Sequence, residues 1–88
     1  MENHLTPLTT VLPGNKVRII SLDGGRGMQE RLVSMGLGPG SKIEVIQRGA
    51  PGPFIVALRD CRLAIGAGMA QKIMVLNEEG KLVVGRKL

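Results

Sequence analysis

Apolar residues recur with helical spacing in the middle of the chain. Met28, Leu32 and Met35 follow one another at i, i+4 and i+7, which places them on one face of a helix. Gly36 then stands where a left-handed C-cap ends a helix, and Leu37 where a Schellman motif has its apolar contact. Because so short a helix is unstable alone in water, its apolar face must pack on the rest of the chain. The pattern therefore predicts a helix over residues 28–35 that covers a core.

Most of the other apolar residues alternate with polar ones, which is typical of half-buried strands. We expect five strands, over Lys16 to Leu22, Lys42 to Arg48, Phe54 to Leu58, Cys61 to Ile65 and Ile73 to Leu76. Thr6 predicts an N-cap for a single helical turn over Pro7 to Val11, because proline is favoured at the first helical position. A second helical turn is expected over Gly66 to Ala70. Lys81 to Val84 has the pattern of one further strand.

Two segments of the chain resemble each other. Pro13 to Ile20 and Pro39 to Ile46, 26 residues apart, each have a Pro-Gly turn, a lysine and alternating β-branched residues. Glycine supplies the positive φ that a type II turn requires after proline. We interpret the two segments as strands launched by the same turn chemistry, not as a duplicated binding unit. A tight turn is also expected at Arg59-Asp60, because Asp tolerates turn geometry.

The predicted strands carry apolar residues on both faces, and an open edge with that pattern promotes aggregation. We therefore predict a mainly β fold, a small closed or nearly closed barrel of about five strands, with the helix across one opening. The 88 residues suffice for one domain with one modest core. We expect a flexible N-terminus over residues 1–4, the barrel over 5–76 and a C-terminal extension over 77–88.

The chain is basic, with a formal net charge of +5 and a pI of about 10.2. This charge permits an acidic partner, but the basic residues are scattered, which is typical of a solvated surface. Cys61 is the single cysteine, so no intramolecular disulfide forms, which fits a reducing compartment. No secretory signal is recognisable, and no apolar run approaches the roughly 20 residues of a membrane span. We expect a cytoplasmic protein without membrane insertion.

The residues that catalysis or cofactor binding requires are not present as sets. The phosphate-binding pattern GxxxxGK[ST] is absent, and the glycines between Gly36 and Gly40 follow a helix, where a dinucleotide fingerprint would open one. His4 is the only histidine, so Cys61 has no general base. The candidate metal ligands have no ligand spacing, and we interpret the methionines as core residues. We expect no catalytic residue, no cofactor and no metal site.

Nucleic-acid binding is one alternative for a small barrel. Val17-Arg18-Ile19-Ile20 after a Pro-Gly turn is similar to the KOW segment of ribosomal and transcription proteins. A KOW segment continues into another strand, however, and here a helical period follows. Phe54 is the only aromatic residue, which is too few for a base-stacking platform. We expect no nucleic-acid partner.

One long string decides between families: Glu30-Arg31-Leu32-Val33-Ser34-Met35-Gly36-Leu37-Gly38-Pro39-Gly40-Ser41-Lys42-Ile43-Glu44-Val45. It resembles the pattern R-L-x-x-M-G-[LI]-x-P-G-x-x-[IV]-x-[VI] of the FeoA family, small cytosolic accessory proteins of bacterial ferrous-iron transport. Leu12-Pro13-Gly14, Arg62-Leu63-Ala64-Ile65 and Ala70-Gln71-Lys72-Ile73-Met74-Val75 match its other segments. The chain departs from the family at Gly66-Ala67-Gly68-Met69, where charged helix formers are usual, and at Asp60, where the hairpin tip often carries glycine.

The resemblance implies an SH3-like β-barrel with a short helix between the first two strands, and a non-enzymatic role in ferrous iron uptake. FeoA-like proteins are thought to act on FeoB, a membrane transporter whose cytosolic G domain binds GTP. Similar domains occur at the C-terminus of iron-dependent repressors. We therefore predict a module that binds the cytosolic part of a FeoB-like transporter, with Met35, Leu37 and Pro39 as apolar contacts.

A metal-ion sensor or carrier is the alternative of a different class. It would bind Fe²⁺ or Zn²⁺ tightly and in stoichiometric amounts. The sequence is also compatible with weak homo-oligomerisation.

Overall fold

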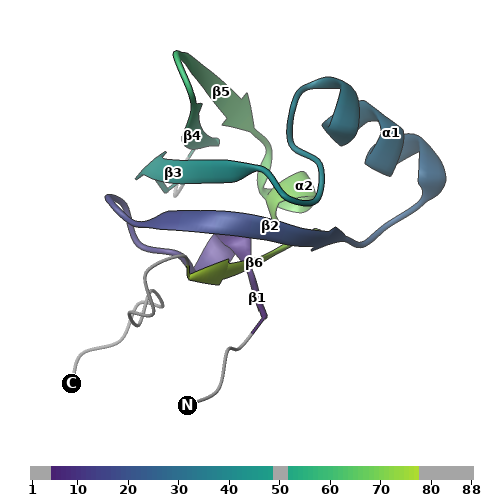
Figure 1. Cartoon of the computed structure of the whole chain (residues 1–88), viewed down its shortest axis with the longest axis horizontal. Helices are drawn as coiled ribbons and strands as arrows, with labels where there is room; N and C mark the ends of the chain where they lie inside the picture. The colour runs from purple at the N-terminus through teal and green to yellow at the C-terminus, as the bar shows by residue number, and fades with distance from the viewer. Residues whose placement is uncertain (1–4, 49–51, 78–88) are drawn as a thin grey trace.

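The computed structural model of the chain describes residues 5–48 and 52–77, which contain one six-stranded antiparallel sheet (Figure 1). In chain order the elements are β1 (Thr6–Pro7), η1 (Leu8–Thr10), β2 (Lys16–Leu22), α1 (Arg26–Ser34), β3 (Lys42–Gln47), β4 (Phe54–Leu58), β5 (Cys61–Ile65), α2 (Ala67–Ala70) and β6 (Ile73–Asn77). The strand order is β1-β6-β2-β3-β4-β5. The five predicted strands are confirmed, with two ends displaced by one residue. The predicted N-terminal tail, the strand at 81–84 and the extension beyond residue 77 lie outside the described residues.

Alternate residues of the strands form one hydrophobic core, joined by residues of η1, α1 and α2. Its buried side chains are Leu8, Val11, Val17, Ile19, Leu32, Leu37, Ile43, Val45, Phe54, Val56, Ile65, Ala70, Ile73 and Val75. Thirteen of these fourteen residues are aliphatic, so the fold depends on close packing of branched side chains. Burying one such side chain contributes about 1.5–3 kcal/mol.

Two β-bulges bend the sheet around this core. The register of β2 against β6 shifts between Ile19 and Ser21, which leaves Ile20 as the extra residue. The register of β3 against β4 shifts between Val45 and Gln47, which leaves Ile46 extra. A bulge bends its strand and increases the local twist. Ile20 and Ile46 are equivalent positions of the two similar segments. Each segment therefore bends its strand at the same position along the segment.

The two similar segments also pair with each other about a local two-fold axis. The Gly14 N–H donates to the Val45 carbonyl at 2.7 Å, and the Gly40 N–H donates to the Ile19 carbonyl at 2.7 Å. Gly14 and Gly40 have φ values of +93° and +94°, which confirms the predicted Pro-Gly turns. Each turn is therefore hydrogen-bonded to the strand that the other turn launches.

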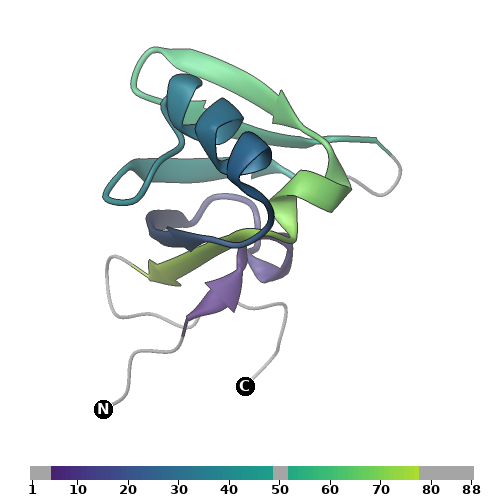
Figure 2. The ribbon, with the colours of Figure 1, turned by 90° about the vertical axis from the view of Figure 1, so that its right-hand side faces the viewer.

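The predicted SH3-like β fold is confirmed, but the sheet is not closed. Strands β1 and β5 are its edges and, in the described chain, are not hydrogen-bonded to each other. Although the sheet does not close into a barrel, its edges are protected from pairing with other chains. Strand β1 has only two residues, one of them Pro7, and β5 carries the exposed Arg62. As predicted, α1 lies across one end of the curled sheet (Figure 2), with Leu32 buried and both Met28 and Met35 packed against the core.

Helix α1 begins at Arg26, two residues before its predicted start. Gly25 is the N-cap with an extended backbone, and glycine is an accepted residue at that position. The Gln29 side chain donates a hydrogen bond to the Gly24 carbonyl at 3.0 Å. Gly27 therefore lies inside the first turn of the helix, although glycine is a poor helix former.

Thr6 is not a helix N-cap, so that prediction was wrong. Thr6 and Pro7 pair with Val75 and Met74 of β6. The Thr6 hydroxyl lies 2.6 Å from the Thr10 hydroxyl, and the helical turn is reduced to the three residues of η1. Proline is accommodated because β1 is an edge strand, where a missing N–H costs no ladder hydrogen bond.

The tip of the β4–β5 hairpin stores backbone strain. Arg59 has a φ of +57° in the predicted two-residue turn, which the pair Leu58 and Cys61 closes. A side chain in the left-handed region costs about 1–2 kcal/mol, and the greater freedom of glycine in the unfolded chain offsets part of this. Arg59→Gly should therefore raise the free energy of unfolding by about 0.5–1 kcal/mol, measured by urea unfolding with circular dichroism. Arg62→Gly, in the extended part of β5, should lower it, and a rise in both variants would contradict the assignment of strain to Arg59.

Candidate partner-binding surface

Helix α1 ends in the predicted Schellman motif. The Leu37 N–H donates to the Leu32 carbonyl and the Gly36 N–H donates to the Val33 carbonyl, both at 2.9 Å. Gly36 has a φ of +92°, as the motif requires. Leu32 and Leu37 are both fully buried. The motif therefore fixes the C-terminal end of the helix to the core.

The loop that follows α1 is held from two directions. The Ser41 hydroxyl donates to the Gly36 carbonyl at 2.9 Å, which ties the loop to the helix end. The Gly40 N–H donates to a backbone carbonyl of β2 at 2.7 Å, and Arg18 Nη1 donates to the Gly40 carbonyl at 3.3 Å. These bonds anchor the loop to the sheet. Pro39, at the exposed tip, is therefore presented on a rigid support.

The three predicted contact residues are adjacent in the chain but differ in exposure. Pro39 is exposed and Met35 is half-buried against the core. Leu37 is 0% exposed. The structure does not support Leu37 as a direct contact, because its side chain closes the core beneath the loop. Contact with a partner through Met35 and Pro39 stays a prediction.

Val33 is an apolar surface residue that the sequence reasoning missed. It is 52% exposed, and a Cβ atom on Gly38 would lie 3.2 Å from Val33 Cγ2, so Val33 packs over the loop. A hollow of about 390 Å³ runs along the same side of α1 and is lined by Arg26, Gln29, Glu30, Val33 and Ser34. Val33 lies off the predicted apolar face. A β-branched residue is disfavoured at an exposed helical position, so the presence of valine there could have indicated a surface that contacts something else.

We call Val33, Met35, Gly38 and Pro39 the helix-end surface. It offers apolar contact on a backbone fixed by hydrogen bonds, a combination that suits binding of another protein. Within residues 5–48 and 52–77, no three His, Cys, Asp or Glu side chains are grouped as metal ligands. In that part of the chain, no helix has the length and apolar character needed to cross a membrane.

The fold and this surface define a small SH3-like module that presents apolar side chains at a rigid helix end. Comparison with known proteins gives its family, because the FeoA domain matches residues 6–77. The chain is also 44% identical over 73 residues to "Putative Fe(2+) transport protein A" of Methanocaldococcus jannaschii, a match that covers 83% of the chain and 88% of that protein. The chain belongs to the FeoA family.

Solved structures support this assignment. The crystal structure of an iron uptake regulatory protein, FeoA, has a TM-score of 0.74 and 39% identity, over 82% of this chain and 95% of that one. The solution structure of FeoA from Chlorobium tepidum has a TM-score of 0.78 over 88% of this chain and 74% of that one, and at 23% identity it shows the likeness of fold alone. A manganese-dependent transcriptional repressor has a TM-score of 0.77 at 20% identity, over 88% of this chain and 44% of its own, and shows the likeness of fold alone.

Proposed function

We propose that this chain is a non-enzymatic accessory protein of ferrous iron uptake that binds the cytosolic part of a FeoB-type membrane transporter. The observation that carries the proposal is the FeoA match across residues 6–77, nearly the whole described chain. A relative that is 44% identical carries the name of an Fe(2+) transport protein. The proposed place of action is the cytoplasm, where the transporter's G domain would be accessible.

The helix-end surface is the proposed contact. Val33 and Pro39 expose apolar area, while the Schellman motif and the Ser41 hydrogen bond fix the backbone beneath them. A rigid surface loses little conformational entropy when it binds, so a small contact area can still give useful affinity. Met35 is partly buried and packs against the core, so it links the exposed contact residues to the rest of the fold.

Uptake of radioactive ferrous iron tests this surface in cells that have the transporter but lack their own FeoA-family gene. The wild-type chain should restore uptake, and the double variant Val33→Asp with Pro39→Asp should restore about tenfold less, because two charges would be desolvated at the interface. Leu5→Asp is the matched control, since Leu5 is 48% exposed and Val33 is 52% exposed.

Full restoration by the double variant would refute the proposed contact surface, as would an equal loss in the Leu5→Asp control. Circular dichroism of the purified variants separates loss of contact from loss of folding. Titration calorimetry with Fe²⁺ in reducing buffer addresses the sensor alternative, because stoichiometric binding to the isolated chain would favour a metal carrier over an adapter.

A further inference from the structure

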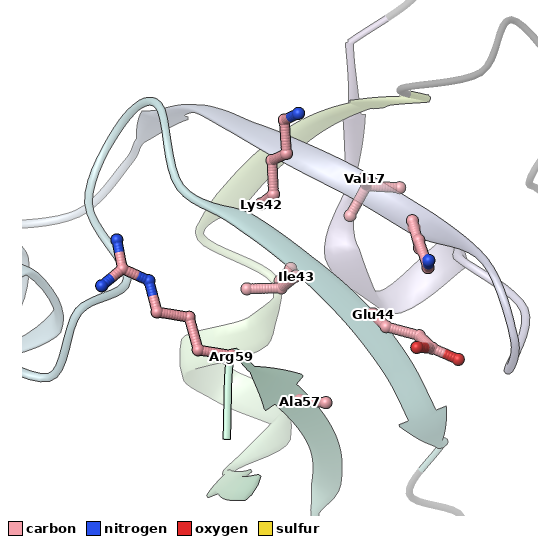
Figure 3. A pocket seen from close by; sticks show the side chains of 7 residues that line it. Val17, Lys42, Ile43, Glu44, Ala57 and Arg59 are labelled. Carbon is pink, nitrogen blue, oxygen red and sulfur yellow. The ribbon is translucent and has the colours of Figure 1, made fainter. Parts of the chain in front are cut away.

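A second hollow lies on the sheet, where the two similar segments meet. The pocket has a volume of about 470 Å³ and is lined by Lys16, Val17, Lys42, Ile43, Glu44, Ala57 and Arg59 (Figure 3). Val17 lies opposite Ile43 in the β2–β3 ladder, at the centre of the local two-fold axis. The side chains of both are buried in the core, so the charged residues, which alternate with them along the strands, line the outer side of the pocket and form its rim.

The two-fold pairing determines which charges meet at this rim. Lys16 and Lys42 occupy equivalent positions of the two segments, so the axis places one lysine on each side. Lys16 lies directly opposite Glu44, and Glu44 lies directly opposite Ala57 of β4. Direct cross-strand neighbours have Cβ atoms about 4.5–5.5 Å apart, so these side chains share one face of the sheet.

Arg59 adds a third cation from the strained hairpin tip. The rim therefore carries three cations and one carboxylate, an excess of two positive charges. Figure 3 shows the charged ends of Lys42, Glu44 and Arg59 pointing apart from one another, so each charge lies on a different side of the pocket. Lys42 and Arg59 are exposed and Glu44 is half-buried. A residue held in a strained backbone conformation is characteristic of functional sites.

The chemistry of the lining favours a peptide over a nucleic acid or a free phosphate. Single-stranded nucleic acid is bound by stacking its bases on aromatic side chains, and Phe54, the only aromatic residue of the chain, is 4% exposed. A free phosphate that bridged the cations would lie close to the Glu44 carboxylate in the middle of the rim, whereas the carboxylates of a peptide are spaced along its chain. An acidic peptide can instead place carboxylates on the cations, an aliphatic side chain over Ala57, and a backbone N–H on Glu44.

We infer that this pocket binds an acidic peptide segment with an apolar residue between its carboxylates. Under the proposed function, on which this identification of the source rests, the segment belongs to the cytosolic part of the transporter. The two similar segments then form one site between them. The symmetry of the turns supplies two of its cations, and the hairpin tip supplies the third.

Fluorescence anisotropy with two synthetic peptides tests the inference on the whole chain. The probes are rhodamine-labelled EDLDE and its uncharged counterpart QNLNQ, and the acidic peptide should bind at least about tenfold more tightly at low salt. The double variant Lys42→Gln with Arg59→Gln should weaken binding of the acidic peptide about tenfold, because two rim cations are lost. Glu44→Gln should strengthen it about threefold by removing the one repulsive charge.

The matched control is Arg26→Gln with Arg31→Gln, which removes the same charge from exposed positions on α1. Affinity of this control should stay within about twofold of wild type. The inference is overturned if the control loses as much affinity as the pocket variant. It is also overturned if QNLNQ binds as well, or if inorganic phosphate or oligo(dT) displaces the peptide at a lower concentration than unlabelled EDLDE does. The peptide experiment contains no transporter. If the peptide does not bind, the proposed binding to the transporter is not refuted, and if the transporter does not bind, the measured affinity for the peptide still stands.

Discussion

Replacing Leu37 by alanine is expected to lower the free energy of unfolding by about 3 kcal/mol, because the deleted side chain leaves a cavity in the core. Leu37 is 0% exposed and joins the end of α1 to the buried side chains of the sheet. Urea unfolding followed by far-UV circular dichroism measures the change, since the chain has no tryptophan or tyrosine for fluorescence.

Pro39→Ala is the control for Leu37→Ala. Pro39 is exposed two residues away, and its truncation should change the free energy of unfolding by less than about 1 kcal/mol. A loss below about 1 kcal/mol for Leu37→Ala would contradict its assignment to the core. It would also restore Leu37 as a candidate for direct contact with a partner.

Gly36→Ala is expected to destabilise the protein by about 2 kcal/mol, through backbone strain and a steric clash together. At Gly36 the φ is +92°, and an added Cβ would lie 2.6 Å from Leu58 Cδ2. Gly40 separates the two causes, because its φ is +94° but nothing lies within 4 Å of an added Cβ. Gly40→Ala should therefore cost only about 1 kcal/mol, for strain alone.

A double-mutant cycle isolates the clash. In a Leu58→Ala background, the cost of Gly36→Ala should fall by at least about 0.5 kcal/mol, because the obstructing atom is gone. The cost of Gly40→Ala should be the same in both backgrounds. An unchanged cost of Gly36→Ala would show that the helix end does not pack on the β4–β5 hairpin.

Features set by local chemistry could be predicted from the sequence. The apolar face of α1 follows from residue spacing, its end from Gly36 and Leu37, and the two turns from their Pro-Gly pairs. Each of these depends on a few neighbouring residues, so tertiary packing did not overrule it. The similarity of the two turn-strand segments was also visible.

Features that depend on long-range pairing could not be predicted. The bulges at Ile20 and Ile46 are defined by the pairing of β2 with β6 and of β3 with β4, and the local sequence does not show which strands pair. The local sequence predicts that Thr6 is a helix N-cap, and only the pairing of Thr6 with β6 shows that it belongs to a strand. The Schellman pattern predicts an apolar contact between Leu37 and the helix, but it does not predict how much of the side chain stays exposed. The structure shows that Leu37 is 0% exposed.

The grouping of charges at the pocket shows the same limit. Lys16, Lys42 and Arg59 are far apart in the sequence, where they resemble a scattered solvated surface. The antiparallel pairing of the two similar segments brings the lysines to one site, and the β4–β5 hairpin adds the arginine. A charge pattern read along the chain therefore does not show which cations a small sheet brings together.

Biolayer interferometry tests whether the chain binds the transporter, with the folded chain immobilised and the cytosolic region of a FeoB-type transporter in solution. We expect saturable binding that Val33→Asp with Pro39→Asp weakens and that Leu5→Asp leaves unchanged. Absence of saturable binding by the folded wild-type chain would contradict this expectation.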